Sequence, residues 1–395
     1  MKRWILPWFL ALAALVAVGL PLKVRLDTPR LGQPVVIAEG HPAWVECRAS
    51  LPWVPARWVK QALKTQWGLD VEGQGLRLLR TERHGNRYRF QITAQAPGPG
   101  VHRTAFDGIW VQGPWPSHFQ VVQAGDFHWP GQEDTLAPFI DEMLVLRPAA
   151  VLFSGDMAYD PDPRWFEMLF RQFHRLEAAG IPVISCPGNH ERKGWSQYLR
   201  TFGPHTFHRV DLGPLAILSL DSAHGRDQFT PSQFQWLKAQ LDDLGGRTPI
   251  LQMHHPTFDP GAYKQGNGDG SGGSLETYRA AFVKLCETRR VPIILSGHWH
   301  QDVVFDSQGR LRDDTPDFPG PKFVTTTALG DADLRQVVRW ERGAFGYRIL
   351  EFEGGRMVRY THDRAGLPKP APIASTPLGT HAPGQASVKA KEVAP

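Results

Sequence analysis

The sequence predicts a layered α/β domain that follows an N-terminal hydrophobic segment and a small β-sandwich. From residue 119 onward, short apolar runs alternate with longer amphipathic stretches, which is typical of strands alternating with helices. Before residue 119, short β-prone runs are separated by turn residues, which favours a small all-β domain. A chain of 395 residues also exceeds what one apolar core usually fills, so we expect more than one domain.

The composition is that of an ordinary globular protein, with 42% hydrophobic and 21% charged residues. The formal net charge is +5, and the basic residues are scattered, so no specific nucleic-acid-binding surface is expected. The cysteines Cys47, Cys186 and Cys286 lie far apart and form no CxxC pair. This spacing excludes a disulfide framework and a zinc finger.

Residues 1–23 predict export. Lys2 and Arg3 precede an uncharged stretch over residues 4–22, which is about long enough to cross a bilayer. Small residues at 17–19 also suit a cleavage site, so a cleaved signal peptide and a retained membrane anchor both stay open. In either case the basic N-terminus stays on the cytoplasmic side and the rest of the chain crosses the membrane. We therefore expect a periplasmic or otherwise extracytoplasmic protein, held at the membrane if the segment is not cleaved.

Residues 24–118 are expected to form the small β-sandwich, of immunoglobulin or fibronectin type. Residues 87–92 alternate between polar and apolar side chains, as in a half-buried strand. Further β-prone runs lie at 34–38, 76–79 and 88–93, and a short helix is expected at 59–65. Gly113 to Pro116 is expected to form the hinge to the next domain.

The second domain is expected to span residues 119–366. Its predicted strands are 119–124, 149–154, 182–186, 215–220, 249–253 and 292–295, and its predicted helices are 136–146, 163–179, 231–244 and 275–289. A closing hairpin is expected at 347–360, where Gly354 and Gly355 break the pattern. Residues 265–274 are rich in glycine and predict a flexible loop, and residues 367–395 predict a disordered tail.

Five short motifs place polar side chains where the predicted strands end. They are Gly125-Asp126-Phe127-His128, Gly155-Asp156, Gly188-Asn189-His190-Glu191, Met253-His254-His255-Pro256 and Gly297-His298-Trp299-His300. Carboxylate, amide and imidazole groups are ligands that suit zinc, manganese or iron. The strand ends of an α/β sheet form the crevice in which ligands bind. Glycine before most of these residues lets backbone and side chains approach closely. The motifs therefore predict a metal site at one edge of the sheet.

In this order, D-x-H, G-D, G-N-H-E, H-x-P and G-H-x-H resemble the motifs of the calcineurin-like metallophosphoesterases. That family includes purple acid phosphatases and bacterial cyclic-nucleotide phosphodiesterases. The resemblance spans roughly residues 119–330. It implies a layered β-sandwich flanked by helices, a phosphate-ester substrate, and two divalent or mixed-valence metal ions, manganese, iron or zinc. A pair of cations about 3.5–4 Å apart lowers the pKa of a bridging water, giving a hydroxide, and neutralises phosphate oxygens.

The resemblance also implies roles, position by position. One metal would be held by Asp126, His128 and His300, and Asp156, which is also given a catalytic role, would bridge to the second. The second metal would be completed by Asn189, His254 and His298. The imidazole of His190 would protonate the leaving oxygen or hold the phosphate, and Glu191 would orient that imidazole.

Three alternatives stay open at this point. His255 is either a pocket residue or a packing residue, because the H-x-P spacing makes His254 the ligand. Tyr159 stands where purple acid phosphatases place a metal-binding tyrosinate, but those enzymes lack a histidine at the position of His128, so a histidine-ligated site is favoured. The third alternative is a non-catalytic surface protein that keeps the fold to bind a phosphorylated ligand.

Overall fold

The computed structural model describes residues 22–38, 41–96, 98–106, 108–127, 133–158, 162–223, 229–258, 275–300, 302–312, 318–326, 328–329 and 346–364. Several predicted features lie outside these residues: His128, Tyr159, residues 1–21, the loop 265–274 and the tail 367–395. Among the helices in the described ranges, none combines the length and the apolar character needed to cross a membrane.

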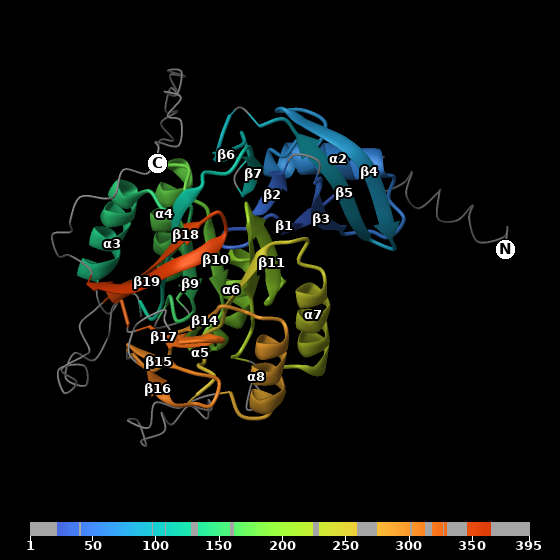
Figure 1. Cartoon of the computed structure of the whole chain (residues 1–395). Helices are drawn as coiled ribbons and strands as arrows, with labels where there is room; N and C mark the ends of the chain where they lie inside the picture. Colours follow the sequence, from blue (N-terminus) through green and yellow to red (C-terminus); the bar gives the residue numbers. More distant parts are fainter. Residues whose placement is uncertain are drawn as a thin grey trace.

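Two small sheets enclose one apolar core in residues 24–112 (Figure 1). One sheet has the order β1-β3-β5-β4 and the other the order β2-β7-β6. These strands are β1 (Val24–Thr28), β2 (Val35–Ala38), β3 (Ala43–Ala49), β4 (Leu76–His84), β5 (Arg87–Ala94), β6 (Val101–Arg103) and β7 (Ile109–Gln112). The predicted alternation is confirmed in β5, where Tyr88, Phe90 and Ile92 are buried. Helix α2 (Ala56–Trp67) packs against β1 and is longer than the predicted 59–65.

Two larger sheets form the centre of the molecule. One has the order β10-β9-β8-β18-β19, and the other has the order β11-β12-β13-β14-β17-β15-β16. The strands of the first are β8 (His118–Ala124), β9 (Ala150–Ser154), β10 (Val183–Cys186), β18 (Gly346–Glu353) and β19 (Arg356–Arg364). The strands of the second are β11 (His208–Leu212), β12 (Leu215–Ser219), β13 (Thr248–Gln252), β14 (Ile293–Ser296), β15 (Val303–Phe305), β16 (Leu311–Arg312) and β17 (Lys322–Thr325). All six strands predicted for this region and the closing hairpin are confirmed.

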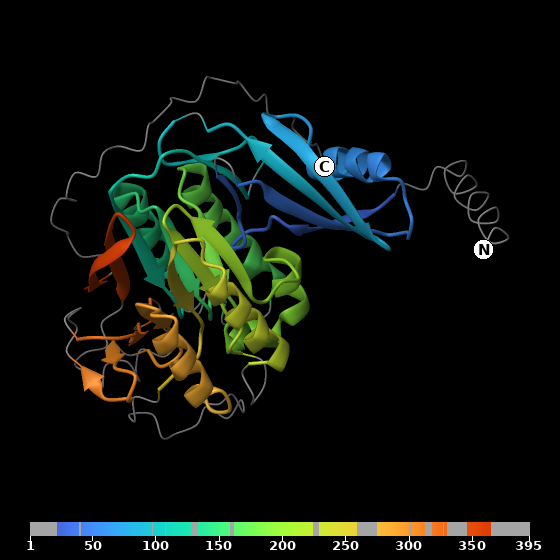
Figure 2. The same cartoon turned by 45° about the vertical axis from the view of Figure 1, so that its right-hand side comes forward.

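Apolar side chains on both faces of the central strands explain the layered arrangement. In β9, Leu152 belongs to the core between the two sheets, whereas its neighbour Phe153 belongs to the core beneath helices α3 (Glu133–Leu146) and α4 (Pro163–Ala178). In β14, Leu295 belongs to the core between the sheets, whereas Ile294 belongs to the core beneath α7 (Pro231–Asp242) and α8 (Arg279–Thr288). The helices therefore cover the two outer faces (Figure 2). Strands buried on both faces carry continuous apolar runs.

Helix α8 begins at Arg279 rather than at the predicted residue 275. The reason is local, because the backbone N–H of Leu275 donates to the carbonyl of Pro256 at 2.8 Å, and the Leu275 side chain is buried in the core beneath α7 and α8. Leu275 therefore holds the chain against the segment that follows His254 instead of starting the helix.

A tight turn fixes the N-terminal sheets to the edge of the five-stranded sheet. The backbone N–H of Ser185, in edge strand β10, donates to the carbonyl of Gly32 at 2.9 Å. A Cβ atom at position 32 would lie 2.1 Å from the Ser185 hydroxyl oxygen, so only glycine fits there. Strand β2 also packs against β11. The N-terminal region thus covers the edge of β10 close to the point where the Gly188-Asn189 motif follows.

Candidate metal centre

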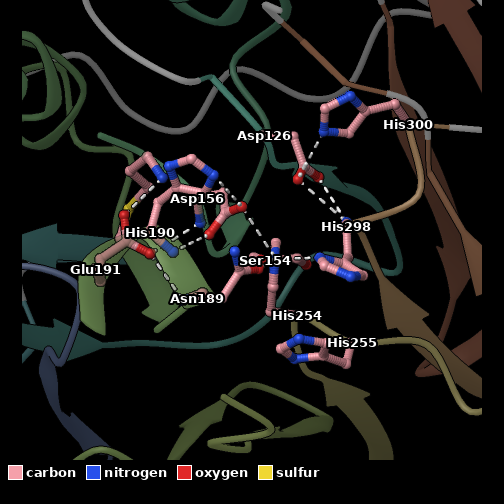
Figure 3. A network of polar contacts seen from close by, with 12 residues as sticks. Asp126, Ser154, Asp156, Asn189, His190, Glu191, His254, His255, His298 and His300 are labelled. Carbon is pink, nitrogen blue, oxygen red and sulfur yellow. Dashed lines mark hydrogen bonds and ion pairs between the residues drawn. The ribbon is translucent and has the colours of Figure 1, made fainter. Parts of the chain in front are cut away.

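The candidate ligands follow the carboxyl ends of neighbouring parallel strands. Strands β8, β9 and β10 run parallel in one sheet, and β12, β13, β14 and β17 run parallel in the other. Asp126 and Asp156 follow β8 and β9, Asn189 follows β10, and His254 and His298 follow β13 and β14. Figure 3 shows these side chains converging from both sheets, as the motif positions predicted.

Four of the candidate residues hold a left-handed backbone conformation. The φ angles are 53° at Asp126, 50° at Asp156, 72° at His298 and 51° at His300. This region is unfavourable for residues that carry a Cβ atom, and such strain is concentrated at functional sites where surrounding structure enforces it. The fold therefore stabilises these four side chains in positions that a free chain would avoid.

Two glycines in the motifs are required by space. A Cβ atom at Gly188 would lie 2.1 Å from Oδ1 of Asp156, and one at Gly297 would lie 2.2 Å from Oδ2 of Asp126. Any side chain at either position would displace an aspartate carboxylate. The close approach expected from the sequence is confirmed at these two positions.

Three other candidate ligand groups lie around Nε2 of His254. Its Nε2 lies 2.9 Å from Oδ1 of Asn189, 3.2 Å from Oδ2 of Asp156 and 3.2 Å from Nδ1 of His298. The ligand atoms of Asp156, His254 and His298 all lie within 4.8 Å of one another. These four residues are the ones assigned to the second metal by resemblance.

The ring of His254 is oriented through its other nitrogen. Nδ1 lies 2.9 Å from the carbonyl oxygen of Ser154, so Nδ1 donates and Nε2 is directed toward the other candidate ligands. Burial lowers the pKa of His254, but the carboxylates of Asp156 and Asp126 outweigh burial and raise the pKa to about 9. Burial, with the imidazoles of His255 and His254, holds the pKa of His298 well below 6.5. Metal binding requires a neutral imidazole, so the raised pKa of His254 opposes binding and the lowered pKa of His298 favours it.

Asp126 and His300 are the described members of the group assigned to the first metal by resemblance. Nε2 of His300 lies 3.4 Å from Oδ1 of Asp126. The backbone N–H of His298 donates to both carboxylate oxygens of Asp126, at 3.1 and 3.0 Å. Asp126 therefore holds the Gly297-His298 turn in place and still faces an imidazole. The third donor expected beside Asp126 and His300 is His128, which lies outside the described residues.

His190 lies beside Asp156, the residue expected to bridge the two metal ions. Its Nε2 is 3.9 Å from Oδ2 of Asp156, and its backbone N–H donates to Oδ1 of Asp156 at 2.9 Å. The side chain is 12% exposed, so it is the more accessible partner of a buried carboxylate. His190 thus reaches the centre from its open side, next to Asp156.

The expected role of Glu191 in orienting His190 is wrong. The Glu191 carboxylate accepts hydrogen bonds from the backbone N–H groups of Gly188, Asp156, Met157 and Ala158, at 2.7, 2.9, 2.8 and 3.1 Å. Its side chain points back from the first turn of α5 (Asn189–Lys193), toward the loop after β9. Glu191 therefore ties the Asp156 loop to the Asn189 loop. It supports the candidate ligands Asp156 and Asn189 through hydrogen bonds to the backbone of their loops. This contact takes the place of the expected orientation of the His190 ring.

His255 is buried and packs against the ring of His298. Its exposed fraction is 1%, and its ring centroid lies 4.3 Å from that of His298. Burial and the neighbouring His254 lower the pKa of His255 to about 3. The hydroxyl of Ser222 accepts the backbone N–H groups of both His254 and His255, at 3.1 and 2.8 Å. His255 contributes packing under His298, and Ser222 fixes the turn that carries both histidines.

Sequence reasoning missed Asp221 and Ser222. They follow β12, which is the parallel neighbour of β13, so the rule applied to the other strand ends would have found them. Asp221 forms an ion pair with Arg192 of α5, whose guanidinium lies 3.6 Å from the ring centroid of Trp195. This pair connects the segment after β12 to the helix that carries Asn189 and His190.

A second ion pair was also missed. Arg348 of β18 is 1% exposed and pairs with Asp302, which follows His300 by two residues. Burial raises the pKa of Asp302, and the guanidinium of Arg348 opposes that rise. The pair connects the strand beside β8 to the segment that carries His300. No pattern in the sequence indicates that Asp302 and Arg348, which are 46 residues apart, form a pair.

Replacement of Arg348 by methionine is expected to lower the free energy of unfolding by about 3 kcal/mol, because it removes the buried guanidinium that pairs with the Asp302 carboxylate. The double variant Arg348→Met/Asp302→Leu should recover most of that loss. Arg356→Met is a matched control, because Arg356 forms an exposed pair with Glu353 in the same hairpin and should cost little. Urea unfolding measures all three. Equal midpoints for the Arg348 and Arg356 variants would contradict a buried pair.

The donor set suits divalent metal ions. The described residues supply two carboxylates, one amide oxygen and three imidazoles, namely Asp126, Asp156, Asn189, His254, His298 and His300. Oxygen and imidazole ligands of this kind bind zinc, manganese and iron. Several are already oriented by hydrogen bonds from backbone or neighbouring groups, as metal ligands generally are.

Comparison with known proteins identifies the class. Residues 119–302 match the model of the calcineurin-like phosphoesterase family. The chain is similar to the glycerophosphodiester phosphodiesterase GpdQ of Enterobacter lignolyticus, with 30% identity over 36% of this chain and 58% of the relative. It is also similar to the 3',5'-cyclic adenosine monophosphate phosphodiesterase CpdA of Escherichia coli, with 28% identity over 42% of this chain and 59% of the relative.

A purple acid phosphatase from yellow lupin seeds is among the similar solved structures. It aligns with 90% of this chain and 77% of its own, at 14% identity and a TM-score of 0.49. The chain spans less than two thirds of the length of the two curated phosphodiesterases. Relatives of this family hydrolyse phosphoric ester bonds.

Proposed function

We propose that the chain is a hydrolase of phosphate esters that uses two metal ions. The observation that carries the proposal is the convergence of Asp156, Asn189, His254 and His298 within hydrogen-bond distances, with Asp126 and His300 beside them. We assign Asn189, His254 and His298 to one ion, Asp126, His128 and His300 to the other, and Asp156 to both. Manganese, iron and zinc all suit these donors.

When bound, such a pair of ions supplies charge neutralisation for phosphate oxygens and an activated water. The residues of the chain hold the candidate ligands and His190 in position. Asp156 is held at Oδ1 by the backbone N–H of His190, and its loop is held by Glu191. His190 is placed to hold a proton at Nε2, on the accessible side of Asp156, and to give it to the leaving oxygen. The buried turn around Ser222 keeps His254 in its place.

The proposal favours phosphodiesters over phosphomonoesters, because the two curated phosphodiesterases named above are similar to this chain. A histidine-ligated centre is proposed rather than an iron–tyrosinate centre. His128 and Tyr159, which distinguish the two kinds of centre, both lie outside the described residues.

The proposal includes the organisation and location of the protein. We propose that residues 24–118 and 119–366 are separate domains, because the two N-terminal sheets have an apolar core of their own. Export is supported by Lys2 and Arg3 ahead of the uncharged run, so we propose a periplasmic or other extracytoplasmic location.

Hydrolysis of bis(p-nitrophenyl) phosphate and p-nitrophenyl phosphate tests the proposal. Chelator-treated and dialysed protein should hydrolyse neither compound, and added manganese should restore hydrolysis, faster for the diester. Reconstitution with zinc and with iron completes the comparison. Failure to hydrolyse either compound with any of the three metals would overturn the proposal and favour a protein that only binds phosphorylated ligands.

A further inference from the structure

The four-stranded N-terminal sheet presents a charged face away from its apolar core. In β3, Val45 and Cys47 are buried in that core, so Glu46 and Arg48 between and beside them lie on the opposite face. The same alternation in β5 places Arg87 and Arg89 on that face, opposite to Tyr88 and Phe90. The core-facing side of these strands is therefore apolar, and the other side is rich in arginine.

A cavity of about 590 Å³ lies between this charged face and residues 204–205, which connect α6 (Trp195–Thr201) to β11. Its lining comes from both parts of the chain: Asp27, Glu46, Cys47, Arg48, His84, Arg87, Tyr88, Arg89, Pro204 and His205. Small-molecule sites commonly have volumes of about 300–1,000 Å³. The cavity is thus large enough for an organic ligand and is bounded by two docked parts of the protein.

The lining is positively charged, since three arginines face two carboxylates, with two histidines beside them. Nε and Nη2 of Arg48 donate to Asp27 at 2.7 and 3.0 Å. Nε and Nη1 of Arg89 donate to Glu46 and Glu82 at 3.0 and 3.3 Å. A guanidinium has five N–H donors, so each of these two arginines is held in place with donors to spare. The ion pairs with Asp27, Glu46 and Glu82 therefore orient the guanidinium groups of Arg48 and Arg89.

Arg87 differs from the other two arginines. Within the part of the chain that the structure describes, it forms no ion pair or side-chain hydrogen bond. It stands at the start of β5, beside the His84 end of β4 and within the cavity lining. The carboxylates in the lining are engaged by Arg48 and Arg89, so the charge of Arg87 is left for a ligand.

We propose that this cavity binds a small phosphorylated molecule through Arg87, Arg48 and Arg89. Guanidinium groups match phosphate oxygens with paired N–H donors. The lining carries three arginines and two carboxylates, and its tyrosine, Tyr88, is fully buried, with its hydroxyl donating to the carbonyl of Val54. That lining favours a sugar or polyol phosphate over a flat aromatic ligand. The cavity also exceeds the size of one phosphate ion. The inference does not rest on the proposed hydrolysis.

Isothermal titration of the full metal-free chain at low ionic strength tests the inference, with glucose 6-phosphate, inorganic phosphate and glucose as probes. Removal of the metals prevents hydrolysis of the ester and binding of phosphate to metal ions. We expect glucose 6-phosphate to bind and glucose not to bind. Arg87→Gln should weaken the binding about tenfold or more, because one charge-assisted hydrogen-bonding group is lost.

Arg77→Gln is the matched control, because Arg77 is an exposed arginine of neighbouring strand β4 that does not line the cavity. It should bind glucose 6-phosphate as the wild-type chain does. Tighter binding of glucose 6-phosphate than of inorganic phosphate supports an ester ligand, and equal binding identifies free phosphate as the source. Absence of binding, equal binding by Arg87→Gln and wild type, or equal binding of glucose and glucose 6-phosphate would overturn the inference.

Discussion

Replacement of Asp156 by alanine is expected to lower phosphodiester hydrolysis about a thousand-fold or more. Its Oδ2 lies 3.2 Å from Nε2 of His254, and its Oδ1 accepts the backbone N–H of His190. The variant therefore loses a donor shared by both proposed metal ions and the anchor of the proposed proton donor. Several kcal/mol of charge stabilisation depend on such a metal pair, and about 4 kcal/mol corresponds to a thousand-fold change in rate.

The measurement is kcat/KM with bis(p-nitrophenyl) phosphate at saturating manganese. Asp156→Asn is the conservative companion, since it keeps the shape of the side chain and removes its charge. Asp242→Ala is the control, because Asp242 is a half-exposed residue of α7 that pairs with Arg289. Hydrolysis by Asp156→Ala at the rate of the control would contradict the assigned role.

Replacement of Glu191 by alanine is expected to lower the free energy of unfolding of the metal-free chain by about 4 kcal/mol or more. The Glu191 carboxylate is 1% exposed and accepts four backbone N–H groups. Each buried donor left without an acceptor costs about 1–3 kcal/mol. Loss of the carboxylate also frees the loops that carry Asp156 and Asn189, so metal affinity should fall as well.

Glu191→Gln should cost less than Glu191→Ala, because its amide oxygen still accepts while its amide nitrogen opposes the remaining donors. Glu167→Ala is the control, because Glu167 forms an exposed pair with Arg171 on α4. Urea unfolding of the metal-free forms separates stability from metal binding. If Glu191→Ala unfolds at the same midpoint as Glu167→Ala, the carboxylate does not hold the two loops.

The sequence was sufficient to predict the strands that carry the ligands, because each contains a short run of buried apolar residues. It was also sufficient to predict which side chains follow them. The H-x-P spacing separated His254, whose Nε2 meets Asn189 and Asp156, from His255, which packs beneath His298. These predictions used only residues that lie close together in the sequence.

Tertiary partners were not predictable in the same way. Glu191 was assigned to its sequence neighbour His190, whereas the fold brings it to the backbone of residues 156–158. Arg348 and Asp302 are brought together only by the placement of β18 beside β8. The cavity beside Arg87 likewise depends on how the N-terminal sheets dock against residues 204–205.

The central claim is that this crevice holds two metal ions that act together on a phosphate ester. Titration of the metal-free chain with manganese, followed by hydrolysis of bis(p-nitrophenyl) phosphate, tests it most directly. We expect activity to rise until two ions are bound per chain and to stop rising there. Two bound ions without hydrolysis, or full activity with a single bound ion, would contradict it.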